Sequence, residues 1–94
     1  MFVGIVRVRL HIHGARSLKE KRSVLRRIKD RARARHNVSA AEVDEQDQHQ
    51  SATLGFAAVG LSRQTLVTLF GRLRDEVDQT LPGGVTDWDE DILS

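Results

Sequence analysis

The sequence predicts a single α+β domain, in which a four-stranded antiparallel sheet carries two helices on one face. The chain has 94 residues, which can bury only one modest core. Apolar residues alternate with polar ones near both ends of the chain, as they do in half-buried strands. Between these ends, apolar residues recur at helical spacing in two longer segments, which are separated by a short apolar run. We therefore expect residues 1–94 to form one domain with two layers.

The first strand and the first helix have the clearest patterns. Over residues 2–13, apolar residues alternate with basic ones, which predicts a strand with one buried face. Gly14 follows at the expected turn. Ser17 and Glu20 then match a capping box, in which the two side chains bond backbone N–H groups reciprocally. They predict a helix over residues 18–36.

Three further strands and one further helix complete the pattern. Residues 38–43 and 52–60 predict the second and third strands, joined by a polar turn. Ser62 is a suitable N-cap for a second helix, whose apolar residues continue to the Pro-Gly-Gly stop at 82–84. Alternation returns over residues 85–93 and predicts a fourth strand at a sheet edge. The patterns predict one shared core that contains Val6, Val8, Leu10, Leu25, Ile28, Phe56, Phe70 and Leu73.

The predicted order of elements is β-α-β-β-α-β. Right-handed crossover connections then give strand order 4-1-3-2, with both helices on the same face of the sheet. This is the ferredoxin-like arrangement. No internal repeat or linker indicates a second domain.

The composition narrows the classes of function. The absence of Cys excludes disulfides and thiolate metal sites. Arg7 and Arg9 interrupt the first apolar residues, so we expect no signal peptide, and no stretch is apolar enough to span a membrane. We expect a cytoplasmic protein.

The net charge of +2 results from a very uneven distribution. Residues 1–36 contain 12 Lys and Arg against 2 Asp and Glu, whereas residues 37–94 contain 3 against 11. This asymmetry favours binding to a polyanion, although the two halves can also neutralise each other in the folded domain.

Most of the basic residues belong to the predicted first helix, whose only acids are Glu20 and Asp30. Clustered cations suit contacts with phosphates, and the N–H groups at the helix start add an attraction for anions. The alternative is a solvated basic face that keeps the protein soluble. The candidate nucleic-acid-binding residues are Arg16, Lys19, Arg22, Arg26, Lys29 and Arg33.

Other charged residues are expected to have structural roles. Lys21 falls within the apolar stripe of the first helix, where an unpaired ammonium is costly, so we expect it to pair with Glu42. Arg7 and Arg9 project from the open face of the first strand, next to the predicted fourth strand. We expect them to pair with the aspartates of that strand. These aspartates are Asp87, Asp89 and Asp91.

No catalytic or metal-binding group is predicted. His11 and His13 share one strand face, which a metal could use with Asp47 or His49 as a third ligand, but a metal site needs three or four convergent ligands. No grouping of Ser, His and Asp indicates a nucleophile with its base. We therefore expect no enzyme activity, no metal, no cofactor and no small-molecule substrate.

Three segments, SLKEKR, NVSAAEVDEQD and QSATLGFA, resemble the bacterial YlxP-like family, a domain of unknown function. The resemblance covers nearly the whole chain. It implies a ferredoxin-like fold. Genes of this family often lie near those for translation initiation and ribosome maturation, so the resemblance also implies a task related to RNA. After Asp47 the family commonly has Trp, where this chain has His49.

Two functional hypotheses of different class follow. The first is a small non-catalytic protein that associates with RNA or the ribosome and binds phosphates through its basic first helix. The second is a protein-interaction module that forms a homodimer, or augments a partner, through its sheet. It would use the exposed second strand or the small-residue face of the third strand, which consists of Thr53, Gly55, Ala57 and Val59. Phosphate binding weakens steeply as salt rises, whereas apolar association does not.

Overall fold

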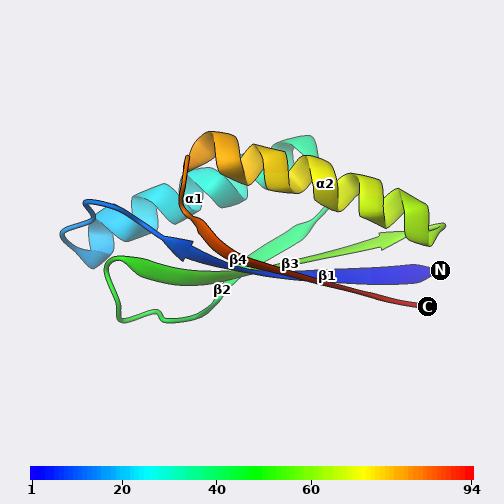
Figure 1. Cartoon of the computed structure of the whole chain (residues 1–94), viewed down its shortest axis with the longest axis horizontal. Helices are drawn as coiled ribbons and strands as arrows, with labels where there is room; N and C mark the ends of the chain where they lie inside the picture. The colour runs from blue at the N-terminus through cyan, green and yellow to red at the C-terminus, as the bar shows by residue number, and fades with distance from the viewer.

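The computed structural model describes residues 1–94 as one sheet covered by a pair of helices (Figure 1). The order of elements is the predicted one, and each boundary lies within two residues of its predicted position. The elements are β1 (Phe2–His11), α1 (Leu18–Arg35), β2 (Ser39–Asp44), β3 (Ser51–Gly60), α2 (Arg63–Thr80) and β4 (Val85–Leu93). Neither helix combines the length and the hydropathy that a membrane crossing requires.

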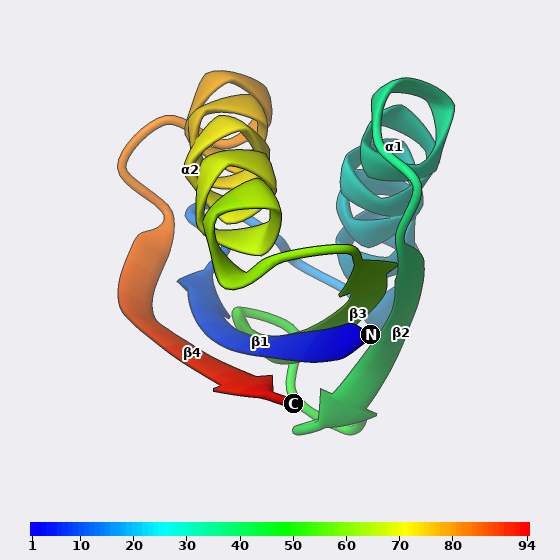
Figure 2. The same ribbon diagram turned by 90° about the vertical axis from the view of Figure 1, so that its right-hand side faces the viewer.

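The four strands form one antiparallel sheet in the order β2-β3-β1-β4. This confirms the predicted order 4-1-3-2 and the ferredoxin-like fold. Both helices lie on one face, with α1 against β2, and α2 against β1, β3 and β4 (Figure 2). The opposite face of the sheet has no covering element, and we call it the open face.

The core lies between the sheet and the helices. All eight residues predicted to share it are buried in a single apolar cluster. Gly4 of β1 allows α2 to approach the sheet closely, because a Cβ at this position would lie 2.6 Å from the Phe70 ring. The helix-facing side of β1 therefore packs closely against α2.

The start of α1 is capped nearly as predicted. Ser17 Oγ accepts a hydrogen bond from the backbone N–H of Glu20 at 3.1 Å. The Glu20 carboxylate accepts from the backbone N–H of Arg16, one residue before the cap. Gly14 supplies the turn between β1 and α1 with a φ of 77°. These contacts fix the direction in which α1 leaves the sheet, and hence the placement of its basic residues.

Candidate nucleic-acid interface

The cations of α1 that face α2 have polar partners. Arg35 Nη1 lies 3.0 Å from Glu76 Oε2, and Glu76 is largely buried between the helices. Arg31 Nη1 donates to Thr80 Oγ1 at 3.4 Å. The cations on this side of α1 therefore join the two helices.

Three cations on the opposite side of α1 form no ion pair. Arg22, Arg26 and Lys29 line a groove of about 260 Å³ where α1 borders β2. They lie at i, i+4 and i+7, which places them on one side of the helix. Glu42 also lines the groove, but it is already paired with Lys21. We call Arg22, Arg26 and Lys29 the basic row.

The other three candidate residues lie near the basic row and differ in their freedom. Arg33 is beside the row, but its Nη2 donates to the carbonyl oxygen of Ala40 at 2.6 Å, and its Nη1 lies 3.7 Å from Asp30. Lys19 is exposed one turn before Arg22. Arg16 is exposed in the segment before the helix, where Ser17 and Glu20 already occupy part of the anion-attracting N–H groups. The structure thus gathers three of the six predicted residues in one groove.

Lys21 is buried at the sheet end of α1, and its predicted partner is confirmed. Its Nζ lies 2.9 Å from Glu42 Oε2. The same Nζ also donates to the backbone carbonyls of Glu45 at 2.6 Å and Gln48 at 2.7 Å. No residue pattern indicated these two bonds, because every residue has a backbone carbonyl whatever its side chain. Lys21 therefore ties α1 to the connection between β2 and β3.

The partners predicted for the arginines of β1, the aspartates of β4, are wrong. The register does place Arg7 opposite Asp89 and Arg9 opposite Asp87 on β4, but neither pair forms a salt bridge. Instead, Arg9 Nη2 bonds Glu45 Oε1 at 2.6 Å. This hydrogen bond raises the pKa of Arg9 above its ordinary value. The physical reason is reach, since the longer Glu45 side chain meets the guanidinium from beyond the sheet end.

Glu45 itself has a left-handed backbone conformation, with a φ of 64°. This conformation is unfavourable for a residue with a Cβ. Arg9 holds its carboxylate and Lys21 holds its carbonyl. Two cations from β1 and α1 therefore fix the β2–β3 connection.

The histidines form no metal centre in this structure. The rings of His11 and His13 meet edge to face with centroids 4.3 Å apart. No three side chains of His, Cys, Asp or Glu converge as metal ligands, and His49 is exposed in the β2–β3 connection.

The open face offers no Phe or Trp side chain on which a nucleic-acid base could stack. The four such residues of the chain are buried in the core or packed against it from the helix side. Many RNA-binding sheets read bases by stacking them on aromatic rings. The basic row, rather than the sheet, is therefore the candidate interface.

Comparisons with known proteins identify a relative and two similar folds. "Uncharacterized protein YlxP" of Bacillus subtilis (strain 168) is 44% identical over 61 residues, which span 65% of this chain and 66% of that protein. The de novo designed protein Foldit4 superposes with a TM-score of 0.55 at 13% identity, covering 99% of this chain and 96% of its own.

The second similar fold is a variant of SnoaB, a cofactor-independent oxygenase from Streptomyces nogalater. Its TM-score is 0.56 at 14% identity, covering 99% of this chain and 91% of its own. At these identities the two structures are similar in fold alone.

The family comparison extends over almost the entire domain. The matching family model is described as "Protein of unknown function (DUF503)", and it matches residues 3–89, from the start of β1 into β4. Together with the YlxP relative, this match confirms the resemblance inferred from the sequence. The chain belongs to the DUF503 family of proteins of unknown function.

Proposed function

We propose that this chain is a non-catalytic RNA-binding accessory protein that contacts phosphates through the basic row on α1. The observation that carries the proposal is the division of the helix's cations. Those facing α2 bond Glu76 and Thr80, whereas Arg22, Arg26 and Lys29 form no ion pair. Adjacent like charges weaken a helix slightly, and a partner that supplies negative charge relieves this repulsion.

The dimensions of the row suit a phosphate backbone. A rise of about 1.5 Å per residue separates Arg22 from Lys29 by roughly 10 Å along the helix axis. Lys19 and Arg33 extend the line of cations to about 21 Å. Such a line contacts several phosphates and carries no side chain placed to read base edges, so binding depends little on sequence.

The choice of RNA comes from the task that the family resemblance implies, and the ribosome is the proposed setting. Phosphate contacts alone do not separate RNA from DNA. The test therefore needs a fragment of ribosomal RNA and a DNA duplex of equal length. Tighter binding to the duplex would contradict RNA as the ligand class.

The decisive experiment is a salt titration of the variant Arg22→Gln/Arg26→Gln/Lys29→Gln. We expect weaker RNA binding for all sequences, and a plot of log K against log salt that is shallower by about 0.7–0.9 for each lost contact. The full loss of three contacts changes the slope by roughly 2–3. Because the three side chains lie at the surface of a groove, unfolding in urea should remain close to that of the wild type.

The matched control is Arg63→Gln/Arg72→Gln/Arg74→Gln, which removes the same charge from α2. This control should retain most of the wild-type affinity and slope. Equal losses in both triple variants would mean that only net charge matters. An unchanged slope in the α1 variant would exclude the basic row.

A further inference from the structure

The open face of the sheet exposes more large apolar side chains than a solvated face normally does. Antiparallel sheets with one free face usually present polar residues there. Here Ile5 is 47% exposed, Val43 54%, Val59 58% and Leu93 54%. These are four of the seven large apolar side chains exposed in the whole molecule. The open face is therefore the main apolar surface of this chain.

Strand register arranges these residues as a diagonal band across all four strands. Val43 of β2 lies against Gly55, and Ala57 pairs with Ile5. Val59 pairs with Val3, which in turn pairs with Leu93 of β4. We call this band the apolar stripe, and it consists of Val43, Gly55, Ala57, Ile5, Val59, Val3 and Leu93.

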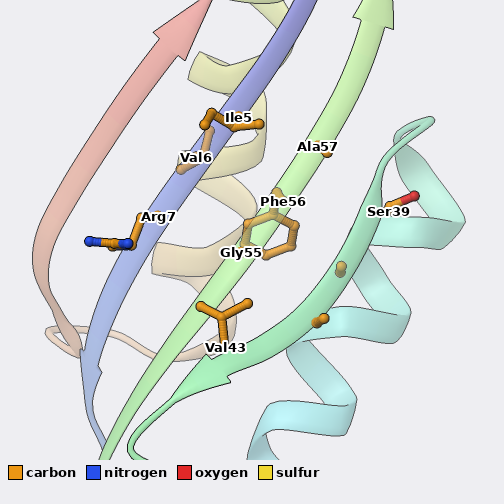
Figure 3. Close-up of a pocket in the computed structure, with 10 residues that line it drawn as sticks. Ile5, Val6, Arg7, Ser39, Val43, Gly55, Phe56 and Ala57 are labelled. Carbon is orange, nitrogen blue, oxygen red and sulfur yellow. The ribbon is translucent and has the colours of Figure 1, made fainter.

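The middle of the apolar stripe is hollowed because its residues there are small. Ile5 and Val43 stand on either side of Gly55 and Ala57, and the hollow between them measures about 400 Å³ (Figure 3). The open face thus carries projecting apolar side chains beside a largely apolar depression.

The charged residues of the open face lie to one side of the apolar stripe. Figure 3 shows Arg7 extending toward β4 and away from the hollow. Arg9 is further along β1, bonded to Glu45. Asp87 and Asp89 lie opposite these arginines on β4. Asp91 lies opposite Ile5 on β4, and Arg7 also lines the hollow. The stripe is therefore bordered by charge on its β4 side, and an occupant must leave that border in contact with water.

We infer that the apolar stripe binds a second copy of this chain, with the two open faces stacked about a two-fold axis along the stripe. A two-fold interface must be self-complementary, because the same patch occurs on both sides. The stripe meets this condition, because an axis along it sets each apolar side chain against the same side chain of the partner, Ile5 against Ile5 and Val43 against Val43. The charged corners fall at opposite rims, which matches the usual anatomy of an apolar centre within a polar border.

The available area fits a weak dimer. Four strands spaced about 4.8 Å apart, with a paired length of about 30 Å, present a flat area of roughly 600 Å² per copy. A standard interface buries about 800 Å² per partner, and smaller ones are transient. The dimer should therefore depend on protein concentration and dissociate in the micromolar range.

Sedimentation equilibrium over the micromolar to millimolar range tests this inference. The wild type should fit a monomer–dimer equilibrium. Ile5→Lys and, independently, Val59→Lys should raise the dissociation constant at least about 10-fold, because each places like charges in an apolar contact. The control Val67→Lys, at an exposed valine of α2, should dimerise as the wild type does. Circular dichroism and urea unfolding confirm that each variant is folded.

A charge-exchange experiment tests the two-fold axis itself. Ile5 lies on the stripe, along which the axis runs, so each copy's Ile5 meets that of the partner. Ile5→Lys and Ile5→Glu should each be monomeric alone and should associate when mixed. A wild type that stays monomeric at millimolar concentration would overturn the inference. So would an unchanged dissociation constant in Ile5→Lys and Val59→Lys, or a mixture of the Ile5 variants that fails to associate.

Discussion

The Lys21 ammonium is buried where α1 meets the β2–β3 connection. It pairs with Glu42, and it donates hydrogen bonds to the backbone carbonyls of Glu45 and Gln48. A buried charge is tolerated only when its hydrogen-bonding capacity is used, and here three oxygens use it. Lys21 therefore acts as a structural residue inside an otherwise basic helix.

Lys21→Met should lower the free energy of unfolding by about 3 kcal/mol, the lower end of the range for breaking a buried pair. The lower end applies because Glu42 keeps some contact with water. Urea unfolding measures the loss, and Lys19→Met at an exposed position should change stability by less than about 0.5 kcal/mol.

A second variant isolates the cost of the Glu42 carboxylate that Lys21→Met leaves without a partner. Adding Glu42→Leu to Lys21→Met removes the carboxylate left without its partner, so the double variant should be more stable than the single one. A double variant that is less stable would show that Glu42 has another role.

At the residue scale, the sequence predicted the contact that the cost of burying a charge requires. An apolar stripe interrupted by Lys21 requires a carboxylate, and Glu42 on the adjacent strand met the requirement. Arg9 has two acids near it, Asp87 on β4 and Glu45 after β2. Arg9 pairs with Glu45, whose position depends on its left-handed backbone conformation, and no residue pattern indicated that conformation.

Among the elements, α1 differs most between its sides. Its buried residues anchor it to the core. The cations on its α2 side have polar partners, and its β2 side carries the basic row. Helical spacing alone predicted which residues share a side. The partners of these cations could not be predicted, because Glu76 and Thr80 belong to α2, far along the sequence, and the partner of Arg33 is a backbone carbonyl, which no residue type indicates.

The anchoring of α1 has a measurable cost. Leu25 is buried in the core cluster, so Leu25→Ala should destabilise the domain by about 2–5 kcal/mol through lost transfer energy and the cavity left behind. Urea unfolding is the measurement, with exposed Ser23→Ala as the control. A loss well below about 1 kcal/mol would mean that the site collapses without a cavity.

The strands were predicted within two residues of their observed ends because their alternation reflects burial by one layer of helices. The same alternation predicted polar residues on the open face, and it holds for β1 only at Arg7, Arg9 and His11. The β3 residues of the apolar stripe, Gly55, Ala57 and Val59, were predicted as part of a candidate interaction face, but the stripe as a whole was not predicted. The stripe arises from register across four strands, and register is a property of pairing rather than of any single strand.

In the whole molecule, the basic row and the apolar stripe lie on different sides of the sheet. The helices cover one face of the sheet (Figure 2), and the exposed residues of the stripe lie on the other. Two copies stacked through their open faces would therefore present two basic rows outward, on opposite sides of the dimer. A long RNA could contact both rows, which raises its apparent affinity without a new contact.

This arrangement predicts that the two surfaces act independently. Ile5→Lys should bind a short RNA fragment with wild-type affinity and salt slope, and lose affinity only for RNA long enough to reach both rows. Fluorescence anisotropy with short and long fragments measures this difference.

The reciprocal variant completes the comparison. Arg22→Gln/Arg26→Gln/Lys29→Gln should dimerise as the wild type does, because its changes lie on the helix side. Loss of short-fragment binding in Ile5→Lys would instead place RNA on the open face.

The central position of β1 has a further consequence for how the domain forms. This strand pairs on one side with β3 and on the other with β4, so that Val3 is joined to Leu93. Pairings between such distant residues require the closure of a long loop before any contact energy is gained, and they slow folding. The β2–β3 pair closes a much shorter loop. We therefore expect β4 to join the sheet late, and until it does, one edge of β1 remains open to pairing with other chains.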